Sequence, residues 1–169
     1  MSDLSIDVHW AGGAPNLAPL ESVRPTEPAP ILIGDPNGGV ELKQLRWGFA
    51  NPGRGGPVIN FRSDGRKFPT GRCLVLVDGF YEYTGEKAPK SKWLFTAASG
   101  SPFFCIAGLV RDDRFTMLTM PPGPDMAPYH DRQVVILPRK LWGEWLGPSP
   151  DVPIPPPAPA GSLKVTQVR

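Results

Sequence analysis

Glu82 and His130 have the residue types and neighbours that proton transfer needs. Tyr81 and Tyr83 flank Glu82. A carboxylate in aromatic surroundings loses hydration, so its pKa rises and it can act as a general acid or base near neutrality. Asp131 follows His130, and a neighbouring carboxylate can hold the tautomer of a histidine that transfers protons at physiological pH. The simpler alternatives are a strand-end glutamate facing solvent and a loop histidine in a local charge cluster.

Asn60 and the residues around it point to a different task, the binding of a substrate. Its amide either positions a substrate or bonds to the backbone in a turn. The surrounding segment 41–72 carries seven basic and two acidic residues, interleaved with Trp47, Phe49, Phe61 and Phe68. A groove that follows phosphates and stacks bases has this composition, and a solvated loop over a few core aromatics is the alternative. The net charge of +2 does not by itself indicate a nucleic-acid partner.

These side chains have to be positioned mainly by β-strands. Short apolar or alternating runs are typical of strands, and the 23 prolines and 19 glycines keep them short. The sequence predicts a mainly β, α+β fold with one helix, from Arg139 to Leu146. The predicted strands are 4–10, 31–33, 40–49, one that opens at 58–59, 73–83 with a possible bulge at Asp78-Gly79, 93–95, 103–110, 114–120 and 133–137.

The length of 169 residues predicts one domain over residues 1–169. Within it we expect an atypical N-terminus (1–15), a proline-rich extended strap (148–161) and a possible closing strand (162–169). No apolar run is long enough to span a membrane, and the first residues do not form a secretory signal. We therefore expect a cytoplasmic monomer without a membrane partner, in which Cys73 and Cys105 are buried thiols rather than a disulfide.

Several motifs occur in one specific order along the chain. They are Leu45-Arg46-Trp47-Gly48-Phe49, Ile59-Asn60-Phe61-Arg62-Ser63, Arg72-Cys73-Leu74-Val75 with Asp78-Gly79-Phe80-Tyr81-Glu82-Tyr83, Ala107-Gly108-Leu109, Phe115-Thr116-Met117-Leu118-Thr119, and Met126-Ala127-Pro128-Tyr129-His130-Asp131-Arg132 before Val134-Val135-Ile136-Leu137. The series, preceded by Arg24-Pro25-Thr26, resembles the SOS-response-associated peptidase family, known also as abasic-site-processing proteins. The resemblance covers roughly residues 16–146.

This resemblance implies a compact α+β domain of coiled, barrel-like antiparallel sheets with few short helices and a positively charged groove. Members are understood to bind abasic sites in single-stranded DNA and to link to the sugar aldehyde through an N-terminal cysteine, which is exposed when the initiator methionine is removed. The implied hydrolase, protease and lyase activities belong to the response to DNA damage, and a bound protein would be associated with the nucleoid.

The resemblance also implies roles for individual residues. Glu82 would handle protons during methionine removal and ring closure, His130 would assist opening of the sugar ring, and Asn60 would orient the N-terminus or the sugar. Trp47 would be a stacking or wedge surface. The phosphate contacts would come from Arg46, Arg62 and Arg72, beside the Pro25-Thr26 segment.

The N-terminus departs from the family pattern, which begins Met-Cys, because position 2 is Ser2. The α-amine of Ser2 can form a Schiff base with an aldehyde, but a hydroxyl closes a ring far less readily than a thiol. Three explanations stay open: a true start upstream with Met-Cys, a divergent homologue that binds DNA without crosslinking, or reaction through the Ser2 amine. Whether the chain is an enzyme therefore stays open, and Cys73 is expected to be structural rather than a substitute nucleophile.

Two other functions compete with abasic-site processing. One is a non-catalytic module that binds single-stranded DNA through Trp47 and the arginines. The other is a protein that binds a partner through the prolines between Pro153 and Pro159, although structural packing of that strap is the expected role. We expect neither a metal nor a cofactor, since His9 and His130 lack ligand spacing and Gly53 to Gly56 lacks the residues of a phosphate-binding loop.

Overall fold

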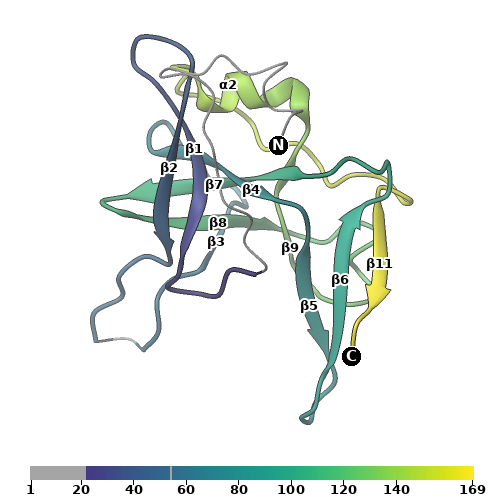
Figure 1. Ribbon diagram of the computed structural model, residues 1–169. Helices are drawn as coiled ribbons and strands as arrows, with labels where there is room; N and C mark the ends of the chain where they lie inside the picture. The colour runs from purple at the N-terminus through teal and green to yellow at the C-terminus, as the bar shows by residue number, and fades with distance from the viewer. Residues whose placement is uncertain (1–21, 54) are drawn as a thin grey trace.

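The larger of two β-sheets closes on itself to form a small barrel (Figure 1). In the computed structural model, which describes residues 22–53 and 55–169, β1 (Pro28–Gly34) pairs with β2 (Val40–Trp47) and with β4 (Arg72–Val77). On the other side β7 (Phe104–Arg111) pairs with β4 and with β8 (Arg114–Met120), and β8 pairs with β2. Because the ring is closed, its strands leave few edges open to pairing with another chain.

Three short strands extend this barrel. β3 (Asn60–Arg62) runs parallel to β8, β9 (Gln133–Val134) runs antiparallel to β8, and β10 (Ile136–Leu137) runs antiparallel to β7. The pairings of β8 with β2 and β3 are the parallel ones among the described strands, and all others are antiparallel. The fold class predicted from the sequence, mainly β with barrel-like sheets and few short helices, is confirmed.

A second sheet of three strands projects from the barrel and contains β5 (Phe80–Thr84), β6 (Ser91–Ala97) and β11 (Leu163–Gln167). The prediction of one strand over 73–83 was wrong, because Asp78 and Gly79 separate β4 in the barrel from β5 in the small sheet. A Cβ on Gly79 would lie 2.9 Å from the carbonyl oxygen of Phe95, so the close approach to β6 requires glycine here. β11 lies within residues 162–169, where the sequence predicted a possible closing strand, and pairs with β6.

Both faces of the barrel sheet are buried, which explains the continuous apolar runs in β4 and β7. Leu74 of β4 belongs to one core cluster, and its neighbours Cys73 and Val75 belong to another. Trp145 lies in the cluster of Leu74, where its indole Nε1 donates to the carbonyl of Cys73 at 2.8 Å. The helical turn that carries Trp145 therefore covers one face of the sheet.

The predicted helix over 139–146 is observed in two parts, a 3-10 turn η1 (Arg139–Leu141) and the short helix α2 (Trp142–Leu146). Within the described ranges, no helix is long and apolar enough to cross a membrane. The predicted strand over 4–10 and the N-terminal segment 1–15 lie outside the described residues.

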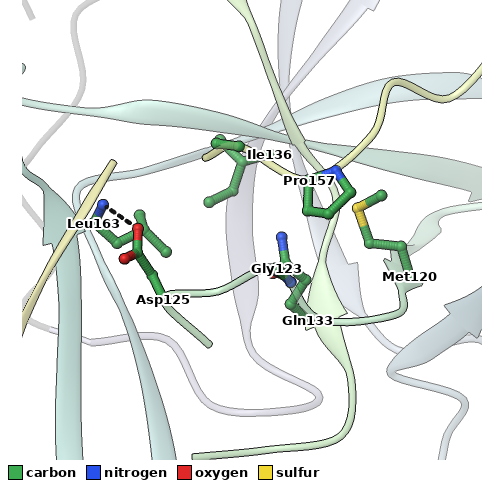
Figure 2. Close-up of a pocket in the computed structure, with 8 residues that line it drawn as sticks. Met120, Gly123, Asp125, Gln133, Ile136, Pro157 and Leu163 are labelled. Atoms are coloured by element: carbon green, nitrogen blue, oxygen red, sulfur yellow. Dashed lines mark hydrogen bonds between the residues drawn. The ribbon is translucent and has the colours of Figure 1, made fainter. Parts of the chain in front are cut away.

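The proline-rich strap is packed onto the domain. Val152 and Ile154 contact the same core cluster as Trp145, and residues 148–159 contain neither helix nor strand. Pro157 helps to close a cavity of about 20 Å³ (Figure 2), and a Cβ on Gly123 would meet the Pro157 ring at 2.8 Å. The Asp125 carboxylate accepts three backbone N–H bonds of 2.9–3.0 Å that fix the end of the strap and the start of β11. These contacts support the structural role expected for the strap.

Candidate nucleic-acid site around Glu82 and His130

Glu82 and His130 lie on the same side of the small sheet. Glu82 pairs with Trp93 of β6, and strand alternation places both side chains on one face, opposite the exposed Tyr81. The Tyr129 ring packs edge-on against Trp93 on that face, with 4.9 Å between centroids. Because Tyr129 directly precedes His130, this contact holds the histidine loop beside Glu82.

The two side chains also interact electrostatically. Partial burial raises the pKa of the Glu82 carboxyl, and the charge of His130 acts in the opposite direction. The flanking Tyr81 and Tyr83 lie on the opposite, exposed face, so the loss of water arises on the face that carries Trp93 and not from these two tyrosines. A carboxyl that holds its proton above the usual pH range, beside an imidazole, has the components of a proton-transfer pair.

The His130 ring is held through its Nδ1 atom, although 43% of the side chain is exposed. The backbone N–H of Arg132 donates to Nδ1 at 3.0 Å, and the Arg132 carbonyl oxygen lies 3.1 Å from the same atom. Asp131 Oδ1 is 3.3 Å from Nδ1 and forms an ion pair with a protonated ring. The ring therefore has a backbone partner both when Nδ1 is bare and when it carries a proton.

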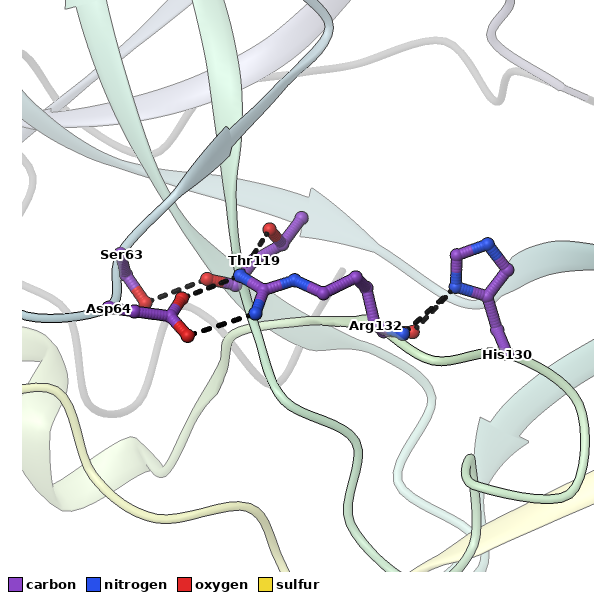
Figure 3. Close-up of polar contacts among 5 residues, drawn as sticks. All are labelled: Ser63, Asp64, Thr119, His130 and Arg132. Carbon is purple, nitrogen blue, oxygen red and sulfur yellow. Dashed lines mark hydrogen bonds and ion pairs between the residues drawn. The ribbon is translucent and has the colours of Figure 1, made fainter.

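Asp64 and Arg132 are two further residues of this region, which the sequence reasoning did not select. The guanidinium of Arg132 donates two bonds to the Asp64 carboxylate, at 2.6 and 3.0 Å, and one to the Thr119 hydroxyl at 3.1 Å (Figure 3). Asp64 follows β3 and Arg132 belongs to the His130 loop, so the ion pair joins two segments that are distant in sequence. Their signal in the sequence was opposite charge beside two motifs that had been singled out.

Asn60 and Arg62 lie on β3 with exposed side chains. Between them, the half-buried Phe61 packs against one core cluster. In the described part of the chain, no hydrogen bond joins the Asn60 amide to Glu82 or His130. The contact between this part of the chain and the histidine loop is instead the Asp64–Arg132 pair, because Asp64 follows β3 directly after Ser63.

Trp47 is half-buried at the end of β2 and is fixed on two sides. Its ring stacks on Phe115, with centroids 6.4 Å apart and planes 11° apart, and its Nε1 donates to the carbonyl of Ile59 at 3.0 Å. Ile59 directly precedes Asn60, so this bond places Trp47 next to β3. The two residues that the sequence analysis assigned to substrate contact thus occupy neighbouring elements.

The Pro25-Thr26 turn lies against the same end of β2. The backbone N–H of Thr26 donates to the Trp47 carbonyl at 2.8 Å, and the backbone N–H of Trp47 donates to the backbone carbonyl of Glu27 at 3.1 Å. Thr26 has a φ of +76°, a region that β-branched residues rarely adopt. Such strain concentrates at functional sites, and here it bends an exposed turn around Trp47.

A family model described as SOS response associated peptidase (SRAP) matches residues 5–168. The chain belongs to this family. Two similar Bacillus subtilis proteins are named abasic site processing proteins, YoaM and YobE. YoaM is 28% identical, and the match covers 79% of this chain and 69% of the length of YoaM. YobE is 29% identical, and the match covers 77% of this chain and 69% of the length of YobE.

Solved structures share the fold. A phage-related protein from Bordetella bronchiseptica matches with a TM-score of 0.71 and 21% identity, over 98% of this chain and 89% of its own. Another Bordetella bronchiseptica protein has a TM-score of 0.70 and 23% identity, over 97% and 92%. At these identities the likeness shows that the SRAP chain has the same architecture as these proteins and nothing about its chemistry.

Arg72 does not fit the phosphate contact expected of this SRAP chain. Its side chain is buried, with 8% of the residue exposed, and it donates to the carbonyls of Trp145, Gly147 and Phe68 at 2.6, 2.6 and 3.0 Å. The sequence placed it in a basic segment, but could not show that the segment returns through the core as β4. Arg46 and Arg62 are exposed, as a phosphate contact requires.

Cys73 and Cys105 are free and buried, as expected. Burial raises the pKa of the Cys73 thiol far above its usual value and that of Cys105 to about 12, so both thiols stay protonated. Neither fits the role of the nucleophile of the SRAP family. Ser2, the remaining candidate, lies outside the described residues.

Proposed function

We propose that this chain processes abasic sites in single-stranded DNA, with Glu82 and His130 as its proton-transfer groups. The observation that carries the proposal is the electrostatic pairing of these side chains in one site, with the pKa of the Glu82 carboxyl raised by burial. Family membership and the names of the two Bacillus relatives support the same substrate. The activity has the character of a lyase and of a self-processing peptidase.

The reaction begins at the N-terminus. Hydrolysis of the Met1–Ser2 peptide bond consumes one water and frees the Ser2 α-amine. His130 assists opening of the abasic sugar by passing a proton from the C1′ hydroxyl to the ring oxygen, which yields the aldehyde. The amine adds to C1′, and protonation of the resulting hydroxyl by Glu82 releases one water and leaves a Schiff base. A carboxyl with a raised pKa is suited to this last step, because it carries its proton closer to neutrality.

The DNA strand is held by residues along β2 and β3. Arg46 and Arg62 contact phosphates, and Trp47, beside the Pro25-Thr26 turn, stacks on or separates bases. A nearby hollow of about 220 Å³ supports this path, since its lining includes Phe49, Phe68, Lys67 and Arg111. Asn60 orients the sugar or the N-terminus from β3.

The test mixes the purified protein, its N-terminus verified by intact mass, with single-stranded DNA that carries one abasic site. Denaturing gels with and without borohydride separate a reducible Schiff base from other products, for the wild type and for the Glu82→Ala and Ser2→Cys variants. We expect a borohydride-dependent adduct in the wild type, a heat-stable adduct in Ser2→Cys, and a severe loss of both when Glu82→Ala is added. Strand affinity in the same samples is measured by fluorescence anisotropy.

Adduct formation in neither protein, together with equal affinity for intact and abasic strands, would overturn the proposal and leave a non-catalytic module that binds single-stranded DNA. An adduct in Ser2→Cys alone would support the roles of Glu82 and His130 but would show that the Ser2 amine is not the nucleophile. An adduct that survives Glu82→Ala at the full rate would remove Glu82 from the chemistry.

A further inference from the structure

His130 depends on a support that starts in the barrel. Ser63 is buried, and both its N–H and its hydroxyl donate to the carbonyl of Thr119 in β8, at 2.9 and 2.7 Å. These bonds fix the backbone next to Asp64. The Asp64 carboxylate therefore has a defined place against the barrel, although it lies after the end of β3.

The Asp64 carboxylate in turn fixes Arg132. Two parallel N–H···O bonds match the planar guanidinium to the carboxylate, and the Thr119 hydroxyl receives a third, so the guanidinium has one favoured orientation. The Arg132 side chain is 16% exposed and that of Asp64 is 43% exposed, so water screens the pair mainly from the side of the aspartate. The strength of the pairing is visible at Asp64, where the hydrogen bond from Arg132 lowers the carboxyl pKa to about 2.

Figure 3 shows that Arg132 extends between the two halves of this region, with its guanidinium at Asp64 and its backbone at His130. The backbone N–H of Arg132 donates to Nδ1 when Nδ1 is unprotonated, and the backbone carbonyl of Arg132 accepts from Nδ1 when Nδ1 carries the proton. The other charged groups around the ring are Glu82 on β5 and Asp131 in the loop. Arg132 is thus the connection between the ring and the barrel.

We infer that Asp64 and Arg132 are positioning residues, which hold the His130 ring in register with Glu82 through both of its protonation states. This inference rests on the proposed function and adds to it two residues that need not touch the DNA. The Asp64–Arg132 pair acts through the backbone of Arg132, and not through the charge of its guanidinium.

The experiment compares Asp64→Asn with Asp64→Glu in single-turnover reactions with an abasic single strand, at saturating protein. Ser2→Cys is the common background, because it gives an adduct that needs no reductant. Asparagine keeps the shape but loses one acceptor and the charge, whereas glutamate keeps the carboxylate on a longer stem. We expect Asp64→Asn to lower the saturated rate about tenfold, within the roughly 100- to 10,000-fold that a general acid–base group contributes, and Asp64→Glu to recover part of it.

Two further readouts separate positioning from general damage. Affinity for an intact strand should change less than about twofold, since the inference gives Asp64 and Arg132 no DNA contact. Ring ¹⁵N spectra, with the His130 signals identified by their loss in His130→Gln, should show a hydrogen-bonded Nδ1 in the parent and a loss of that hydrogen bond in Asp64→Asn. Arg132→Lys keeps the backbone N–H but loses the two-pronged guanidinium, and should resemble Asp64→Asn.

An unchanged saturated rate in Asp64→Asn, with the parent protein active, would overturn the inference and leave the proposed function standing. So would a loss confined to strand affinity, because it would make Arg132 a DNA contact. Absence of an adduct in the parent would instead be a failure of the proposed function, and in that case the ring ¹⁵N spectra still decide whether Asp64 holds the ring against the Arg132 backbone.

Discussion

Two arginines show how differently this domain uses the same side chain. Arg72 is buried between the barrel and α2, where its guanidinium donates to three backbone carbonyls and lies over the Trp145 ring, 5.4 Å from its centroid. Arg132 lies at the edge of the candidate site and donates to a carboxylate and a hydroxyl. One arginine binds neutral groups that do not titrate, and the other binds a group that does.

The difference separates scaffold from site. Carbonyl partners keep their hydrogen-bonding character at every pH, so the hydrogen bonds of Arg72 in the barrel region do not change with pH. The region of Glu82, His130, Asp64 and Arg132 is made of titratable groups on β5 and on two loops, and proton positions there depend on the surroundings. We expect changes in the first region to alter stability alone, and changes in the second to alter proton transfer as well.

The largest effect is expected at Glu82. Glu82→Gln should lower the rate of adduct formation roughly 100- to 10,000-fold, because it removes the proton donor. The same change should raise the melting temperature more at pH 7 than at pH 5, since a carboxyl whose pKa is raised by folding destabilises the native state increasingly as pH rises above its unfolded-state pKa. Single-turnover kinetics and thermal melts at pH 5 and pH 7 provide the measurement. A loss of both rate and stability in Glu82→Gln at pH 7 would contradict the distinction between the candidate site and the structural barrel region.

Removal of Arg72 should have the largest effect on stability. Arg72→Met leaves three carbonyls without their donor, at a cost of about 3–5 kcal/mol in the free energy of unfolding. Urea titration measures the loss, and Arg46→Met is the matched control, because an exposed arginine changes stability by about 0.5 kcal/mol or less. Equal midpoints for the two variants would show that the buried guanidinium is not a structural clamp.

A smaller effect is expected at the strap. Asp125→Ala removes the acceptor of three backbone N–H groups of Gly161, Ser162 and Leu163, and should lower stability by about 1–2 kcal/mol, since the carboxylate is partly exposed. Limited proteolysis should then cut within the strap, while the saturated rate of adduct formation stays within about twofold. A large loss of rate would mean that the strap contributes to the site.

The sequence predicted much of the fold because strand patterning is local. The runs around β2, β7 and β8 lie close to their observed bounds, and the helix ended where Gly147 and Pro148 required. The break at Asp78-Gly79 was missed, because apolar and aromatic residues continue on both sides and only the packing of Gly79 against β6 shows that the sheet changes. Burial of Arg72 was missed for a similar reason, since its three carbonyl partners include two that follow it by more than seventy residues.

The motifs of the candidate site could be predicted from the sequence, but the Asp64–Arg132 pair beside it could not. Glu82 and His130 stood out through their neighbours, and the structure brings them together. The link from Asp64 to Arg132 spans 68 residues and is an ordinary pair of opposite charges until the barrel places β3 beside the histidine loop. Opposite charges beside two motifs were the signal in the sequence, but a long-range ion pair has no periodicity, so this signal did not show which charges would meet.

The two arginines should differ most directly in their response to acid. The hydrogen bond from Arg132 lowers the pKa of the Asp64 carboxyl from 3.8 to about 2, so the pair stabilises the fold above pH 4, and this contribution is lost as pH falls through about 2. The difference in unfolding free energy between wild type and Asp64→Asn should therefore be present at pH 6 and disappear near pH 2. The loss caused by Arg72→Met should vary less over that range, because its three hydrogen-bond acceptors are carbonyls and the Glu144 carboxylate is the titratable group that acts on it. Urea titrations at four pH values measure both differences, with Asp151→Asn as the control for an exposed pair with Lys67. Parallel pH dependence in Asp64→Asn and Arg72→Met would mean that the acid response belongs to the whole fold and not to the edge of the site.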